Sequence, residues 1–212
     1  MGGGRHPAPL SEWQTSITPG LTMSKRIDND CDSGLPVDLA FKCITCMEDV
    51  LQEDPREGPK PIKRCENRKL MTRALRLNNN TLTDLHGFGE IVEKLLSDPS
   101  HLCWIDLSFN DLPSIDPVLT MYRHLSVLNL HGNSISDLSE VDKLAALPDL
   151  RSLSLHGNPI ETEKSYRSYI LSLLPNLKTL DFSAVTKQDR VTADVWRRMT
   201  PKATRVKRSK KE

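Results

Sequence analysis

The segment LSVLNLHGNSI at residues 125–135 decides the fold of this chain. It follows the pattern L-x-x-L-x-L-x-x-N-x-L, in which isoleucine can stand for leucine. The pattern returns in full as LCWIDLSFNDL at 102–112 and as LRSLSLHGNPI at 150–160. Three complete copies in 212 residues indicate an internal repeat, and a repeat determines the architecture before any single element is considered.

Two less regular copies flank these three. The upstream copy has Thr72 in place of the first leucine, and the downstream copy, which includes Phe182, has Val185 in place of the asparagine. The fourth position of the five copies recurs at intervals of 23 to 30 residues, at Leu75, Ile105, Leu128, Leu153 and Leu180. The repeats therefore run through most of the second half of the chain.

The spacing of the pattern has a direct structural meaning. Positions four and six alternate as in a β-strand, so both side chains point to the same side. One such unit cannot bury its apolar face alone, but stacked units share a continuous core. The asparagine amide can satisfy backbone groups of adjacent coils at the turn. We therefore predict an α/β leucine-rich-repeat solenoid with a parallel sheet on its concave side.

Outside the strands, the sequence predicts short helices and a cap. Apolar residues recur every third position after the asparagine, as at Ile135 and Leu138, which predicts a convex side of 3₁₀ or short helical turns. Near the C-terminus, a capping-box sequence at 186–189 precedes apolar residues at four-residue steps, at Val191, Val195 and Met199. These residues predict a cap helix that covers the last coil.

Composition divides the chain into five segments. They are an arm expected to be disordered at 1–34, a possible degenerate repeat with a proline-rich insertion at 35–69, the repeats at 70–185, the cap helix at 186–200 and a basic tail at 201–212. Val37, Leu39 and Ile44 match apolar positions of the repeat, which favours the degenerate copy. The alternative is a short amphipathic arm unrelated to the repeats.

The net charge of +1 hides an asymmetry. Residues 196–212 carry eight Lys or Arg against one acid, so this segment has a charge of +7 and the rest of the chain −6. Its basic side chains, Lys207, Arg208, Lys210 and Lys211 among them, could bind tubulin tails or nucleic acid or act as a nuclear address. The alternative is a solvated end. Because no signal peptide or apolar span stands out, we expect a cytoplasmic protein that does not enter the membrane.

The concave face is the candidate site for a protein partner. Side chains between the buried leucines point outward, and those expected to contact the partner are Arg76, Trp104, Asp106, Val127, Asn129, His131, Ser154 and His156. Trp104 is the strongest candidate, because tryptophan dominates binding hot spots. The alternative is that Trp104 packs across its neighbours as a local lid.

Catalytic and metal chemistry find little support in the sequence. His131 and His156 stack in consecutive repeats but supply only two ligands, so we expect a structural role for them. Cys43 and Cys46 form a C-x-x-C without a second pair, which is typical of ordinary packing here. No phosphate loop or nucleophile motif is present. We therefore expect no enzyme, no metal and no cofactor.

The segment YRSYILSLLPNLKTLDFSAVTKQDR at 166–190 resembles the cap of the SDS-twenty-two type of protein phosphatase-one regulators. Similar caps close the axonemal outer-arm dynein light chain and the spliceosomal U-two A-prime protein. The whole chain resembles cilia- and flagella-associated leucine-rich-repeat proteins. This resemblance implies a scaffold in an axonemal or other cytoskeletal assembly. The alternatives are a ribonucleoprotein-associated or a phosphatase-regulating adaptor, and direct nucleic-acid binding is disfavoured because the concave face lacks a basic surface and an aromatic row.

Overall fold

The computed structural model describes residues 34–58 and 60–200. The predicted basic tail at 201–212 and, apart from Gly34, the predicted disordered arm at 1–34 lie outside the described residues.

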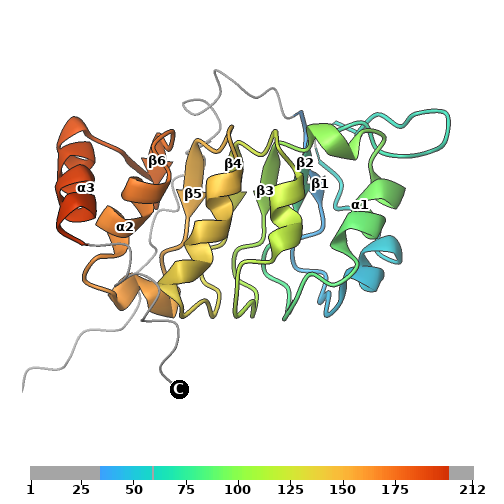
Figure 1. Cartoon of the computed structure of the whole chain (residues 1–212). Coiled ribbons are helices and arrows are strands. Elements are labelled where there is room, and N and C mark those ends of the chain that lie inside the picture. The colour runs from blue at the N-terminus through green and yellow to red at the C-terminus, as the bar shows by residue number, and fades with distance from the viewer. Residues whose placement is uncertain (1–33, 59, 201–212) are drawn as a thin grey trace, which may run out of the picture. The chain divides into compact units, whose positions relative to one another are not determined.

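Seven strands form one sheet in chain order (Figure 1). They are β1 (Val37–Asp38), β2 (Ala74–Arg76), β3 (Trp104–Asp106), β4 (Val127–Asn129), β5 (Ser152–Ser154), β6 (Thr179–Leu180) and β7 (Ser183–Ala184). Strands β1 to β6 pair in parallel, and β7 pairs antiparallel with β6. The register aligns the fourth positions of the five copies, from Leu75 to Leu180, which confirms the solenoid.

The core is a row of aliphatic side chains with a ladder of asparagines at its edge. Ile105, Leu128 and Leu153 are completely buried in one cluster. Each burial of this kind stabilises the fold by about 1.5–3 kcal/mol. The Asn133 amide donates to the Leu107 and Leu130 carbonyls, and its Oδ1 accepts from the backbone N–H of Leu112. Each asparagine thus joins two coils, as the repeat pattern predicts.

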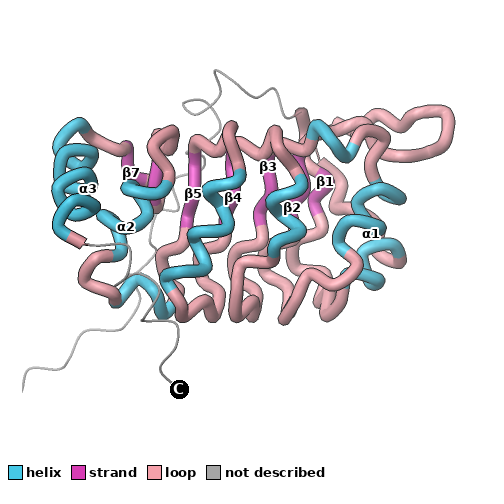
Figure 2. The backbone as a smooth tube through the Cα atoms, in the orientation of Figure 1, coloured by secondary structure: helices cyan, strands magenta, loops and turns pink. Residues whose placement is uncertain are grey.

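Helices cover the convex side of the sheet (Figure 2). The α-helices are α1 (Phe88–Leu95), α2 (Tyr166–Leu173) and α3 (Lys187–Met199), and the 3₁₀ helices are Met47–Leu51, Pro99–His101, Pro117–Met121, Leu138–Ala146 and Pro159–Thr162. Apolar steps of three residues fit the three-residue turn of a 3₁₀ helix, and Val141 and Leu144 are buried. The expected convex side is therefore confirmed.

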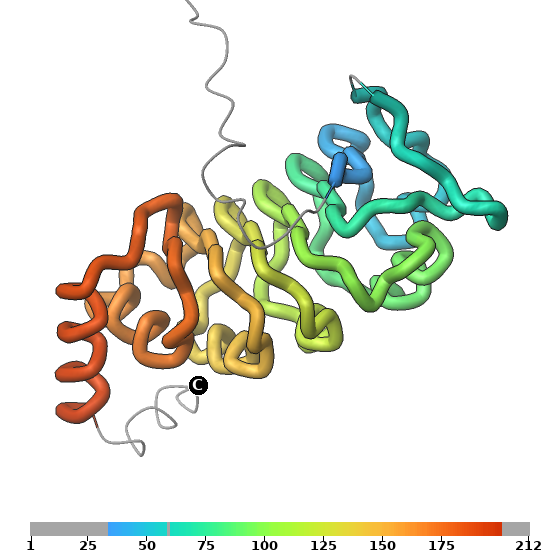
Figure 3. Tube along the Cα trace, turned by 90° about the horizontal axis from the view of Figure 1, so that it is seen from above, coloured from blue at the N-terminus to red at the C-terminus, as the bar shows by residue number. Residues whose placement is uncertain are grey.

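At the N-terminal end of the sheet, β1 adds a further coil. Val37 lies opposite Leu75, and Asn80 donates to the Leu39 carbonyl, so this coil continues the asparagine ladder. The proline-rich insertion at 53–64 extends beyond β1 (Figure 3). The backbone N–H of Arg56 in this insertion donates to the Asp38 carbonyl at 2.7 Å. The insertion thus covers part of the edge strand β1, and an uncovered edge strand would favour aggregation.

The predicted cap helix is present, but it packs with a different face. Helix α3 begins at the predicted capping box and packs against α2 through the buried Ala193, while Val191, Val195 and Met199 are exposed. The prediction that these three cover the last coil was wrong. Their four-residue spacing marks a stripe on the helix but does not say which face turns inward. The Arg190 guanidinium donates to carbonyls of α2 and of the loop after it. These bonds hold the face of α3 that carries Arg190 and Ala193 against α2.

The fifth copy also departs from its expected geometry. Phe182 was expected in the second buried position, but it is exposed, because the chain turns back after Leu180 to form β7. The turn residues Asp181 and Phe182 have positive φ values of 49° and 59°. Asp181 replaces the asparagine of the other coils as the side chain that joins two coils. Its Oδ1 accepts hydrogen bonds from the backbone N–H groups of Leu155 and His156.

Candidate functional site

The structure places all eight predicted contact residues on β2 to β5 or on the turns that follow β4 and β5. Five of them are partly exposed, namely Arg76, Trp104, Val127, Asn129 and His156. Three are nearly buried, namely Asp106, His131 and Ser154. The row is therefore a mixed surface, in which some residues offer contact area and others hold their neighbours in place.

Trp104 and Arg76 form the N-terminal half of this surface. The Arg76 guanidinium carbon lies 5.4 Å from the centre of the Trp104 ring, within cation–π range. The same guanidinium contacts Asp38 Oδ2 at 3.3 Å. Trp104 is thus held on one side by a paired cation and keeps part of its ring exposed, as a contact site requires.

A hydrogen-bonded chain of three side chains lies under the middle of the surface. Ser154 Oγ donates to Asn129 Oδ1 at 3.1 Å and lies 2.8 Å from His131 Nδ1. Since the hydroxyl hydrogen goes to Asn129, the network assigns a hydrogen to His131 Nδ1. Ser154 is buried, so it orients His131 and Asn129 and does not itself reach a partner.

Four rings form an aromatic cluster at the C-terminal half: Phe109, His131, His156 and Phe182. The two imidazoles stack with centres 4.7 Å apart and planes at 10°. Phe182 meets both of them edge-on at 5.3 Å, and Phe109 meets His131 edge-on at 5.0 Å. The two phenylalanines remain exposed by 52% and 50% respectively. The cluster thus presents two exposed phenyl rings beside the stacked imidazoles.

Backbone geometry makes these phenylalanines unusual. Phe109 and Phe182 have φ values of 52° and 59°, in a region that favours glycine and is rare for bulky residues. The position equivalent to Phe109 in the next two repeats holds Gly132 and Gly157, also with positive φ. A Cβ on Gly132 would lie 2.6 Å from the Phe109 ring, so the glycine leaves the space that this ring occupies. Asn79, the equivalent residue of the preceding coil, also has a positive φ, so the repeat imposes this backbone conformation at Phe109.

Sequence reasoning missed both phenylalanines. Phe109 could have been found by aligning the repeats, because it replaces glycine at a position that needs glycine in its neighbours. Phe182 gave no comparable signal, since its turn follows a copy whose pattern predicts a continuing strand.

The electrostatics of the cluster disfavour the protonated form of His131. Burial lowers the pKa of His131, and the neighbouring Asp106 acts against this shift without overcoming it. His156 Nδ1 is buried without a hydrogen-bond partner, 3.7 Å from Asp181 Oδ1. Within residues 34–58 and 60–200, no group of three or more His, Cys, Asp or Glu side chains is placed to hold a metal ion.

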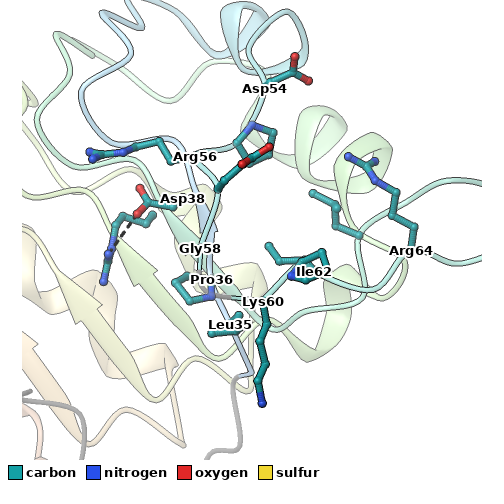
Figure 4. Close-up of a pocket in the computed structure, with 14 residues that line it drawn as sticks. Leu35, Pro36, Asp38, Asp54, Arg56, Gly58, Lys60, Ile62 and Arg64 are labelled. Atoms are coloured by element: carbon teal, nitrogen blue, oxygen red, sulfur yellow. Dashed lines mark hydrogen bonds and ion pairs between the residues drawn. The ribbon is translucent and has the colours of Figure 1, made fainter.

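A separate pocket of about 790 Å³ lies between the first coil and the proline-rich insertion (Figure 4). Pro36, Pro55 and Ile62 supply apolar walls, and Arg56 and Lys60 are among its charged lining residues. Cys43 and Cys46 are not part of its lining; both are free and exposed. In the part of the chain that the structure describes, no helix is long and apolar enough to cross a bilayer.

Comparison with known proteins places the chain in a family. Residues 110–209 match the family model described as "Leucine-rich repeat", which describes a repeat and no catalytic activity. Leucine-rich repeat-containing protein 51 of Bos taurus is 59% identical over 81% of this chain and 91% of its own length. The Homo sapiens protein of the same name is 56% identical over 79% of this chain and 87% of its own length.

The fold has a counterpart among solved structures. A chain in the crystal structure of the Drosophila melanogaster SNF/U2A′ complex aligns with a TM-score of 0.55 and 22% identity, over 78% of this chain and 97% of that one. At this identity the match bears on the fold alone. The sequence relatives alone establish that this chain belongs to the leucine-rich repeat-containing protein 51 family of leucine-rich-repeat proteins.

Proposed function

We propose that this chain is a non-catalytic scaffold that holds a protein partner against the concave face of its sheet. The observation that carries the proposal is a set of three partly exposed aromatic side chains on or beside this face: Trp104, Phe109 and Phe182. Exposed aromatic rings bury large apolar areas when a partner covers them. Two of these rings, those of Phe109 and Phe182, are about half exposed.

The charges of the face favour a protein over a nucleic acid. Binding of a phosphate backbone relies on several unpaired cations. On this face Arg76 is already paired with Asp38, and Asp106 adds a negative charge. A partner with apolar and basic side chains fits such a surface better than an RNA does.

The partner, in this proposal, belongs to a ciliary or flagellar axoneme or to another cytoskeletal assembly. Support comes from the sequence at 166–190, which resembles the caps of axonemal and regulatory leucine-rich-repeat proteins, and from the overall resemblance to cilia- and flagella-associated proteins. The basic side chains of the tail, at Lys207, Arg208, Lys210 and Lys211, would add attraction to acidic tubulin surfaces.

Proximity labelling of the tagged full-length protein in ciliated cells tests this proposal. We expect an axonemal signal and a set of labelled proteins that Trp104→Ala reduces. Met121→Ala is the matched control, because Met121 is exposed on the convex side. Both variants should melt at the temperature of the wild type. Diffuse nuclear signal without an axonemal fraction, or equal labelling by both variants, would contradict the proposal.

A further inference from the structure

Three aspartates occupy the same position of their coils, one residue after the central strand position: Asp38, Asp106 and Asp181. Asp38 accepts from the Ala40 N–H through Oδ1 and pairs with Arg76 through Oδ2. Asp181 also uses both oxygens, since its Oδ2 accepts from the Tyr166 hydroxyl at 2.9 Å. Two of the three carboxylates are therefore fully engaged.

Asp106 differs from both. Its Oδ1 accepts from the Ser108 N–H at 3.1 Å and from the Ser108 hydroxyl at 2.6 Å. Among the described residues, its Oδ2 receives no hydrogen bond and no cation lies within ion-pair distance. The residue is only 8% exposed. Asp106 Oδ2 therefore keeps its capacity to accept a hydrogen bond from a ligand.

The neighbours of Asp106 do not neutralise it. Arg76 lies opposite Asp106 in the sheet register, but its guanidinium is engaged with Asp38 and Trp104. On the other side, Asn129 accepts from Ser154 and carries no charge. Burial lowers the pKa of His131, which disfavours its protonated form. The middle of the concave face therefore carries the negative charge of Asp106, which is not paired with a cation among the described residues.

We propose that this position binds a cationic side chain of the partner, and an arginine in particular, with its guanidinium on Asp106 Oδ2. The inference rests on the proposed function and names the chemistry of the partner at one point of the face. A guanidinium offers several hydrogen-bond donors and stacks on aromatic rings. The same coil supplies such rings, because Trp104 points to the same side of β3 as Asp106 and Phe109 follows at the next turn.

A second acceptor supports the assignment. Asn78 Oδ1, on the coil before Asp106, is buried and accepts no hydrogen bond. Asn78 follows β2, the strand that pairs with β3, so the two acceptors belong to adjacent coils. A free acceptor such as Asp106 Oδ2 requires a ligand with a hydrogen-bond donor, which an apolar side chain or a carboxylate cannot provide.

The test begins with random peptides displayed on phage and selected on the full-length protein. We expect the enriched peptides to share an arginine, or less often a lysine. Replacement of that arginine by citrulline should weaken binding about tenfold or more, because citrulline keeps the shape and loses the charge. Asp106→Asn should weaken it to a similar degree. Asp111→Asn is the control and should change the affinity by less than about threefold, because it removes an exposed charge from the same coil outside the concave strand.

Thermal unfolding separates a binding role from a structural one. Asp106→Asn keeps an acceptor for Ser108 and removes the uncompensated charge, so the melting temperature should stay equal or rise. A lowered melting temperature would show that the charge is structural and would overturn the inference.

The outcomes also distinguish this inference from the proposed function. Peptides that depend on Trp104 but contain no basic residue, or that bind Asp106→Asn unchanged, refute the cation site and leave the partner face intact. If no selected peptide depends on Trp104, the partner face itself is refuted, and the cation site with it.

Discussion

Gly132 offers a sharp test of how the aromatic cluster is built. Its φ of +67° lies in the left-handed region, and a Cβ placed on it would lie 2.6 Å and 2.9 Å from two atoms of the Phe109 ring. Gly132→Ala should therefore destabilise the protein in two separate ways. The alanine adopts an unfavourable backbone conformation, and the Phe109 ring has to leave its contact with His131.

The two contributions have comparable sizes. A left-handed alanine costs about 1–2 kcal/mol. Loss of an edge-to-face ring contact costs about 0.5–1.5 kcal/mol. Gly132→Ala should thus lower the free energy of unfolding by about 2–3 kcal/mol in the wild-type background. In a Phe109→Ala background only the backbone contribution remains, so the cost should fall by about 1 kcal/mol.

Urea unfolding of the four proteins of this double-mutant cycle measures the difference directly. Gly89→Ala is the control glycine, since a Cβ there meets nothing within 4 Å and the position lies in α1. That change should raise the free energy of unfolding by up to about 1 kcal/mol. Equal destabilisation by Gly132→Ala in both backgrounds would refute the placement of the Phe109 ring over Gly132.

Three further predictions concern the C-terminal part of the chain. Tyr166→Phe removes the hydroxyl that donates to Asp181 Oδ2 and should lower the free energy of unfolding by about 1–2 kcal/mol in urea, with unchanged stability contradicting a role for this bond. Asp189 pairs with Arg167, and this pairing lowers the pKa of Asp189 in the folded protein. The pairing therefore stabilises the fold above the unfolded pKa of about 4, and this stabilisation is lost as the pH falls. Melting temperatures from pH 6 to pH 2 should therefore fall more for the wild type than for Asp189→Asn, and parallel curves would refute the pairing. Truncation after Thr200 should abolish any microtubule binding that weakens steeply as the salt concentration rises. Binding that survives the truncation would rule out the tail as its source.

The repeat register could be predicted from the sequence because it depends on a strong and redundant signal. Ile105, Leu128 and Leu153 stand at the same place in three complete copies, and a shift of any one would expose a leucine. The asparagines add a second constraint, since each must satisfy backbone groups of two coils. Pattern and hydrogen bonding agree, so the predicted fold was confirmed.

The features that escaped prediction have separate physical causes. Phe182 turns outward because β6 ends in a tight turn of two left-handed residues, and a phenylalanine there gives no sign of the turn. The exposed stripe of α3 escaped for another reason: Ala193 is small and Arg190 is charged, so the inward face does not look apolar in sequence. At the site, Trp104 was accessible to sequence reasoning, whereas the missing partner of Asp106 depends on where Arg76 is engaged.

Photocrosslinking in ciliated cells tests the central claim most directly. A photoreactive amino acid replaces Val127, which is partly exposed on the concave face, and in a second protein it replaces Met121 on the convex side. Light should produce a discrete higher-mass adduct from the Val127 position and none from Met121. Adducts from Met121 alone would contradict the account, because they would place the partner on the side of the helices.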